Sequence, residues 1–106
     1  YRTYSEQGVR LLFIPSNFTR QTGRAHWDVL VRARAIENQS FVIAPNQCGK
    51  NTANGVESYG HSMVVGPWGE VLAQAQNLEN VITCELDPAA IEQAAAKVPA
   101  LDHRML

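Results

Sequence analysis

Residues 9–44, VRLLFIPSNFTRQTGRAHWDVLVRARAIENQSFVIA, carry the pattern that decides the fold. Residues 9–14 are almost entirely apolar and are followed by Pro15, which is typical of a short strand buried on both faces. Residues 25–39 contain neither Gly nor Pro and predict the main helix, and residues 40–44 predict a second buried strand. The order of strand, helix and strand indicates a βαβ unit and therefore an α/β fold.

The predicted helix has one narrow polar stripe, made by Asp28, Arg32 and Gln39. Apolar residues occupy most of the remaining circumference, which predicts a helix covered on more than one side. His26 and Glu37 point roughly opposite the stripe. We therefore expect them to be paired, in a buried network that also includes a nearby arginine.

That arginine is Arg34, which lies beside Trp27 on the apolar surface of the helix. If His26, Arg34 and Glu37 formed a buried network, removing one member would leave the others uncompensated, at a cost of several kcal/mol. These four residues are the predicted structural or interface residues of the helix.

The pattern changes after residue 44. Residues 50–58 are polar and predict a surface loop. Three short strands of an antiparallel meander are predicted at residues 61–65, 71–75 and 81–86. Asp87 and Pro88 are typical of an N-cap and a first helical position, which predicts a short helix over residues 89–98. No linker divides the chain, so we expect residues 1–106 to be part of a single domain.

The composition limits the classes of function. The chain has 106 residues, of which 45% are hydrophobic and 18% charged, with a formal net charge of -1. The chain has no excess of basic residues of the kind that a nucleic-acid-binding protein carries. No apolar run reaches the roughly 20 residues of a membrane span. We expect neither nucleic acid nor membrane as a partner. Cys48 and Cys84 lack metal-ligand spacing, which predicts reduced thiols, no metal site and a cytoplasmic location.

Several side chains could be proposed as nucleophiles. Thiol catalysis would pair Cys48 with His61 or His26, but Cys48 lies in a loop without a helix N-terminus behind it, which favours a structural role. Ser16 and Ser62 occur in no nucleophile motif. Cys84 alternates with polar neighbours in a predicted strand, which favours a small buried side chain.

Asn17 and Phe18 are stronger candidates for a binding site. They lie in the predicted loop of residues 15–23, just past the end of a buried strand, where α/β proteins bind ligands. A carboxamide and an aromatic ring can line a small-molecule pocket there. The alternative is structural, since Asn often bonds its own turn and Phe often closes the edge of a core.

Several blocks of the chain resemble the nitrilase superfamily of carbon–nitrogen hydrolases. They are IPSNFT at 14–19, TGRAHWDVL at 22–30, RARAIENQ at 32–39, SYGHSMVV at 58–65 and PWGEV at 67–71. The resemblance spans nearly the whole chain, and its nearest branch is the Nit amidases, which include enzymes acting on deaminated glutathione and on ω-amides of keto acids.

The resemblance implies a four-layer α-β-β-α sandwich that dimerises through helices into an eight-layer assembly. It places the helix of residues 25–39 between its own sheet and the partner subunit. It also implies thiol-dependent hydrolysis of a small amide without a cofactor. A Glu base, a Lys and a Cys nucleophile would do the chemistry, and in the family all three precede the matched blocks.

The chain therefore resembles the C-terminal part of such a hydrolase, with no catalytic residue of its own. It begins with Tyr1 rather than Met, and residues 1–8 are typical of the end of a helix closed by Gly. We expect the missing N-terminal part of the same protein to be a partner, and residues 1–106 alone to be inactive and prone to aggregate. Asn17, Phe18 and Thr19 are the predicted substrate contacts. The alternative is a non-catalytic interaction or dimerisation module.

Overall fold

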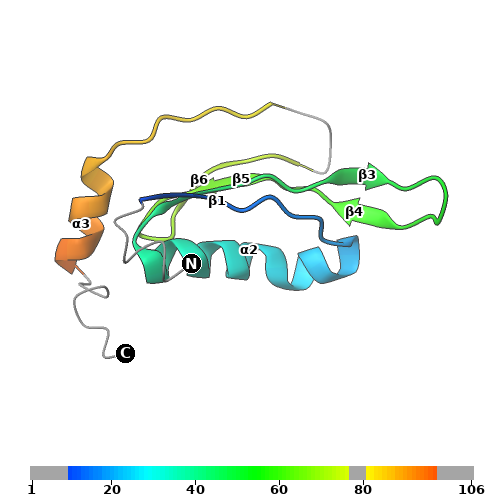
Figure 1. The fold of residues 1–106 in the computed structure, drawn as a ribbon, viewed down its shortest axis with the longest axis horizontal. Coiled ribbons are helices and arrows are strands. Elements are labelled where there is room, and N and C mark those ends of the chain that lie inside the picture. Colours follow the sequence, from blue (N-terminus) through cyan, green and yellow to red (C-terminus); the bar gives the residue numbers. More distant parts are fainter. Residues whose placement is uncertain (1–9, 77–80, 98–106) are drawn as a thin grey trace.

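The computed structural model describes residues 10–76 and 81–97 as one sheet, a hairpin and two helices (Figure 1). The helices are α2 (Arg20–Asn38) and α3 (Ala89–Lys97). The strands are β1 (Leu11–Phe13), β2 (Phe41–Ala44), β3 (Cys48–Lys50), β4 (Glu57–Tyr59), β5 (Met63–Val65) and β6 (Val71–Gln74).

The sheet confirms the predicted α/β fold. Its strand order is β1-β2-β5-β6, in which β1 and β2 are parallel and the other neighbours are antiparallel. The parallel pair is joined by α2, so the predicted βαβ unit is present. Helix α2 covers one face of the sheet along its length (Figure 1).

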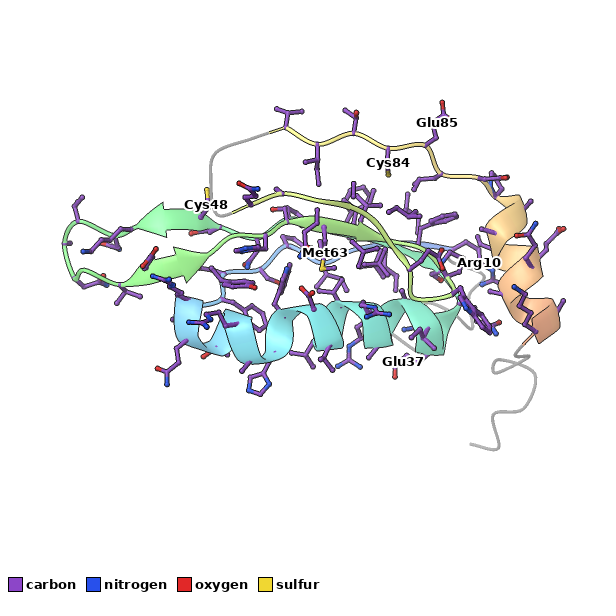
Figure 2. All side chains as sticks on the ribbon, turned by 180° about the vertical axis from the view of Figure 1, so that it is seen from behind. Arg10, Glu37, Cys48, Met63, Cys84 and Glu85 are labelled. Atoms are coloured by element: carbon purple, nitrogen blue, oxygen red, sulfur yellow. The ribbon has the colours of Figure 1, made fainter. Side chains whose placement is uncertain are left out.

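The core lies between α2 and that face. Figure 2 shows Met63 between the sheet and α2, and Glu37 on the outer side of the helix. The cluster of buried apolar side chains consists of Leu12, Trp27, Val31, Ala35, Val42, Ala44, Met63 and Val65. On each strand these residues alternate with residues of the other face, as the two-residue period of a strand requires.

Helix α2 begins earlier than the sequence predicted. It starts at Arg20 instead of residue 25, and the side chain of Thr19 caps it by accepting a hydrogen bond from the Thr22 amide at 3.4 Å. Gly23, whose presence favoured a loop, lies inside the helix. At the other end, Gln39 is the left-handed C-cap with φ of 48° and is buried, so it does not belong to the predicted polar stripe.

Gly23 is required by the close approach of α2 to Tyr59. A Cβ atom at this position would lie 2.3 Å from the ring carbon Cγ of Tyr59, well inside contact distance. We expect Gly23→Ala to lower the free energy of unfolding by about 1–3 kcal/mol, because overpacking outweighs the higher helix propensity of Ala. Chemical denaturation measures this, with Arg24→Ala on the exposed side of the same turn as control. A more stable Gly23→Ala variant would contradict the packing described.

Two predicted features downstream are wrong. Residues 50–58 are not only a loop, because Cys48–Lys50 and Glu57–Tyr59 pair as the antiparallel hairpin β3–β4. Residues 81–86 form no strand: this segment passes over the face of the sheet opposite α2 (Figure 1) in an irregular conformation. Cys84 is accordingly exposed and not buried, although Figure 2 shows it on the side of the segment that faces the sheet.

The predicted C-terminal helix is confirmed as α3 over residues 89–97. Asp87 caps it, accepting a hydrogen bond from the Ala89 amide at 3.0 Å. The helix lies beside the β5–β6 turn, where the Lys97 ammonium is 5.2 Å from the ring centroid of Trp68. Arg32 of α2 also holds this turn, donating from Nε to the Gly69 carbonyl at 2.7 Å.

Strand β1 is covered on one face only, contrary to the prediction. Leu12 is buried beneath α2, whereas Leu11 and Phe13 point away from the helix and are 40% and 63% exposed. The reason is that no other layer of the described residues covers this second face of β1.

The outer side of α2 is likewise open in the single chain. Val29 and Leu30 are exposed, so the described residues cover the helix on one side rather than several. The described residues do not bury the predicted network of His26, Arg34 and Glu37. Arg34 pairs with Glu37 at 2.7 Å across one helical turn, with both side chains more than 40% exposed, and His26 is exposed outside that pair.

Candidate functional site

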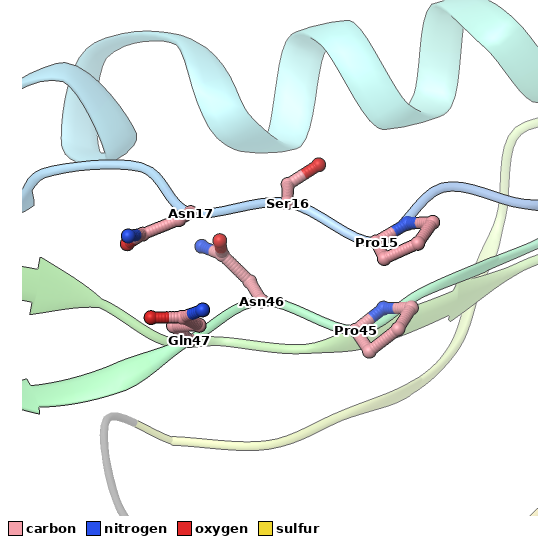
Figure 3. Close-up of a pocket in the computed structure, with 6 residues that line it drawn as sticks. All are labelled: Pro15, Ser16, Asn17, Pro45, Asn46 and Gln47. Carbon is pink, nitrogen blue, oxygen red and sulfur yellow. The ribbon is translucent and has the colours of Figure 1, made fainter.

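A groove of about 510 Å³ lies at the carboxyl ends of β1 and β2 (Figure 3). Its lining residues are Pro15, Ser16, Asn17, Pro45, Asn46 and Gln47. The two lining segments continue the parallel pairing of the strands, since the Ser16 amide donates to the Pro45 carbonyl at 2.9 Å and the Gln47 amide donates to the Ser16 carbonyl at 3.1 Å. This is the edge where α/β sheets bind ligands.

The extended backbone after β1 separates the predicted substrate residues. Asn17 points away from α2 and is exposed, and Thr19 is exposed at the start of α2, which its side chain caps, whereas Phe18 is half-buried on the helix side. The Phe18 ring packs edge-on against Trp27, with centroids 5.1 Å apart and planes at 61°. Phe18 therefore lines a different, smaller cavity of about 200 Å³, together with Ile14, Ser16, Trp27, Leu30, Val31 and Arg34.

Asn17 and Thr19 share a second opening beside the groove. This hairpin pocket has a volume of about 310 Å³ and is lined by Asn17, Thr19, Gln47, Cys48, Gly49, Lys50, Asn51, Asn54, Val56 and Ser58. Since Asn17 and Gln47 line both spaces, the groove and the hairpin pocket adjoin. Two of the three predicted substrate residues are therefore close to one site, and Phe18 faces the other side of the chain.

Asn46 is a central residue of the site that was not among the predicted substrate contacts, although the sequence places it at the end of the second buried strand, a potential ligand edge. It is 8% exposed, and its carboxamide oxygen accepts from the Phe18 amide at 3.1 Å while its nitrogen donates to the Gly60 carbonyl at 2.7 Å. The Asn46 amide donates to the hydroxyl of Ser62 at 2.8 Å. One side chain thus joins the loop after β1 to the segment that enters β5. Its only sequence signal was an Asn directly after a buried strand.

The candidate nucleophiles of this chain are not arranged for catalysis. Within residues 10–76 and 81–97, no hydrogen bond joins Cys48 to a histidine. The His61 ring is stacked on Tyr59 at 4.0 Å, with Nδ1 2.6 Å from the Tyr59 carbonyl. The hydroxyls of Ser16 and Ser62 donate to backbone carbonyls. The geometry therefore agrees with the structural interpretation of these residues.

The described part of the chain has neither a metal-binding cluster nor a membrane-spanning helix. It contains no group of three or more His, Cys, Asp or Glu side chains placed to hold a metal ion. Neither of its helices combines the length and the apolar character that a membrane crossing requires.

The family model for carbon–nitrogen hydrolases matches residues 1–96. The chain belongs to the carbon–nitrogen hydrolase family. It is 42% identical over 105 residues to a deaminated glutathione amidase of Synechocystis, covering 99% of this chain and 38% of that protein. It is 43% identical over 100 residues to the deaminated glutathione amidase of Mus musculus, covering 94% of this chain and 31% of the relative.

Solved structures of this hydrolase family have the same fold. The crystal structure of the Caenorhabditis elegans NitFhit protein matches with a TM-score of 0.91 and 42% identity, over 98% of this chain and 25% of that one. These matches confirm the resemblance to the nitrilase superfamily and its Nit members. The chain spans well under half the length of these relatives.

Proposed function

We propose that residues 1–106 are the C-terminal part of a hydrolase that converts a small amide to a carboxylate and ammonia. The observation that carries this proposal is the 42% identity over 99% of the chain to a relative named as an amidase. The groove at the carboxyl ends of β1 and β2 supports it, because this is where an α/β fold presents a ligand to groups from neighbouring strands.

In the proposed reaction, a cysteine outside residues 1–106 attacks the amide carbonyl carbon. Ammonia leaves with a proton supplied by a Glu acid–base residue, and water then hydrolyses the thioester to regenerate the thiol. A Lys would stabilise the negative oxygen of the tetrahedral intermediate. No cofactor takes part. Residues 1–106 contribute the groove wall, and for this reason we expect them to be inactive alone.

The proposed assembly is a four-layer sandwich that pairs into an eight-layer dimer in the cytoplasm. Two exposed apolar surfaces support it: Leu11 and Phe13 on the open face of β1, and Val29 and Leu30 on the outer side of α2. The first suits packing against a second sheet of the same protein. The second suits a helix of another subunit, with His26, Trp27, Arg34 and Glu37 as structural or interface residues.

Phe18 is proposed to shape the acyl pocket from its position against Trp27. We expect Phe18→Ala in the intact enzyme to change the ratio of kcat/KM between a short and a longer amide by roughly tenfold or more, since pocket size separates substrates that differ by a methylene to this degree. Steady-state assays of an amide series measure the ratio. Glu92→Gln, an exposed change on α3, is the control. Unaltered specificity constants for every amide would refute this role of Phe18.

The proposed function is tested by measuring ammonia release from the full-length protein. Deaminated glutathione, α-ketoglutaramate and a nitrile serve as substrates. The proposal expects turnover of at least one of the two amides and little or no turnover of the nitrile. Absence of turnover with every amide, in a folded full-length protein, would favour the alternative of a non-catalytic interaction module.

A further inference from the structure

The hairpin β3–β4 is held firmly against the candidate site. The Tyr59 amide donates to the Phe18 carbonyl at 2.8 Å, and the Gly60 amide donates to the Gln47 carbonyl at 2.8 Å. An ion pair of 3.2 Å also links Arg20, at the start of α2, to Glu57 on β4. The walls of the hairpin pocket are therefore fixed by the loop after β1, the loop after β2 and the hairpin itself.

The pocket has one charged lining residue, the cation Lys50. The carboxylate nearest to it in the strand register is Glu57, its cross-strand partner, which is paired with Arg20. Among the residues that the structure describes, no ion pair includes Lys50. No carboxylate lines the pocket, so its net charge is positive.

Three carboxamides of the lining present donors rather than acceptors. The side-chain oxygen of Asn17 accepts from the Ser58 hydroxyl at 3.0 Å, and that of Asn51 accepts from the Ala53 amide at 2.8 Å. The oxygen of Asn54 accepts from the Val56 amide at 2.9 Å. Because each oxygen is used within the protein, each side-chain amino group is the part left to donate to a ligand. Such a set is complementary to an anion.

We propose that the hairpin pocket binds the carboxylate of an amide substrate and that Lys50 is the residue that recognises its charge. This inference rests on the proposed function. Asn17 and Gln47 line both the groove and the pocket, so a molecule that extends across the two spaces can place its amide in the groove and its carboxylate beside Lys50. Hydrogen bonds to a charged group are stronger than those between neutral groups, which makes Lys50 the main determinant of selectivity.

The test uses the full-length protein with succinamate and its neutral methyl ester as matched substrates. We expect Lys50→Gln to raise KM for succinamate about tenfold to a hundredfold, the loss expected of one charged hydrogen bond, with kcat within about threefold. KM for the ester stays within about twofold, and Lys50→Arg retains the preference for the acid. Lys97→Gln removes the same charge from α3, at the opposite end of the molecule (Figure 1), and serves as control.

Equal changes for the acid and the ester, or no change for the acid, would overturn the role of Lys50. Calorimetry with succinate, the dicarboxylate product of succinamate hydrolysis, distinguishes a failure of the Lys50 proposal from a failure of the proposed function. If the wild-type protein hydrolyses no amide but binds succinate, a Kd weakened about tenfold or more in Lys50→Gln supports the pocket. An unchanged Kd, or no binding of succinate to the wild-type protein, overturns it.

Discussion

Trp27→Ala is expected to lower the free energy of unfolding by about 3–5 kcal/mol, the range for removing a large aromatic side chain from a core. Trp27 is 1% exposed and lies between α2 and the sheet. Its ring supports Phe18, and its Nε1 donates to the His61 carbonyl at 2.7 Å. His61 has a left-handed backbone with φ of 59°, so this bond also holds a conformation that is uncommon for His.

Chemical denaturation of the longest polypeptide that contains this chain measures the effect. Trp27→Phe keeps an aromatic ring but leaves the carbonyl of His61 without its donor, so we expect a smaller loss of about 1–3 kcal/mol. Val29→Ala, at a position 68% exposed on the same helix, should change stability by no more than about 0.5 kcal/mol in the single subunit. A Trp27→Ala variant as stable as Val29→Ala would show that the core does not depend on this ring.

Asn46→Leu is expected to cost roughly 2–6 kcal/mol, because two buried backbone groups lose their partners at about 1–3 kcal/mol each. These groups are the amide of Phe18 and the carbonyl of Gly60. Asn46→Asp distinguishes the contributions of the two hydrogen bonds, because its carboxylate can still accept from the Phe18 amide but cannot donate to the Gly60 carbonyl. Asn46→Leu should also loosen the groove, since the loops on the two sides of the groove are joined through the Asn46 side chain.

Thermal and chemical unfolding of Asn46→Leu and Asn46→Asp check this prediction. Gln47→Leu is a matched control, because Gln47 is the next residue, is exposed and makes no side-chain hydrogen bond with the described part of the chain. A cost for Asn46→Leu no greater than that for Gln47→Leu would contradict the linking role. Retention of full stability by Asn46→Asp would show that the bond to Gly60 contributes nothing.

The βαβ unit, with its order of strand, helix and strand, was predictable from sequence because both strands are short, apolar and followed by Pro. The start of α2 was not, since Gly23 normally disfavours a helix and only its contact with Tyr59 explains why it lies there. The hairpin was missed because Lys50 and Glu57 pair between polar strands without alternating hydrophobicity. Residues 81–86 alternate like a strand, but the structure assigns no strand to them.

The candidate site was predictable only in outline. The position of Asn17 after a buried strand correctly indicated the edge where the groove lies. The sequence does not show which side of an extended segment each residue faces, so it grouped Phe18 with its neighbours although Phe18 points to Trp27. The bonds of Asn46 join residues 14 and 28 positions apart, and such distant pairs have no local signal.

The most direct test of the account is to locate the acyl-enzyme. The full-length protein is mixed with an amide substrate, quenched during turnover, digested and analysed by mass spectrometry. The account predicts an acyl group on a cysteine outside residues 1–106, in the wild-type protein and equally in the Cys48→Ala and Cys84→Ala variants. An acyl group on Cys48 or Cys84, or amide hydrolysis by residues 1–106 alone, would contradict it.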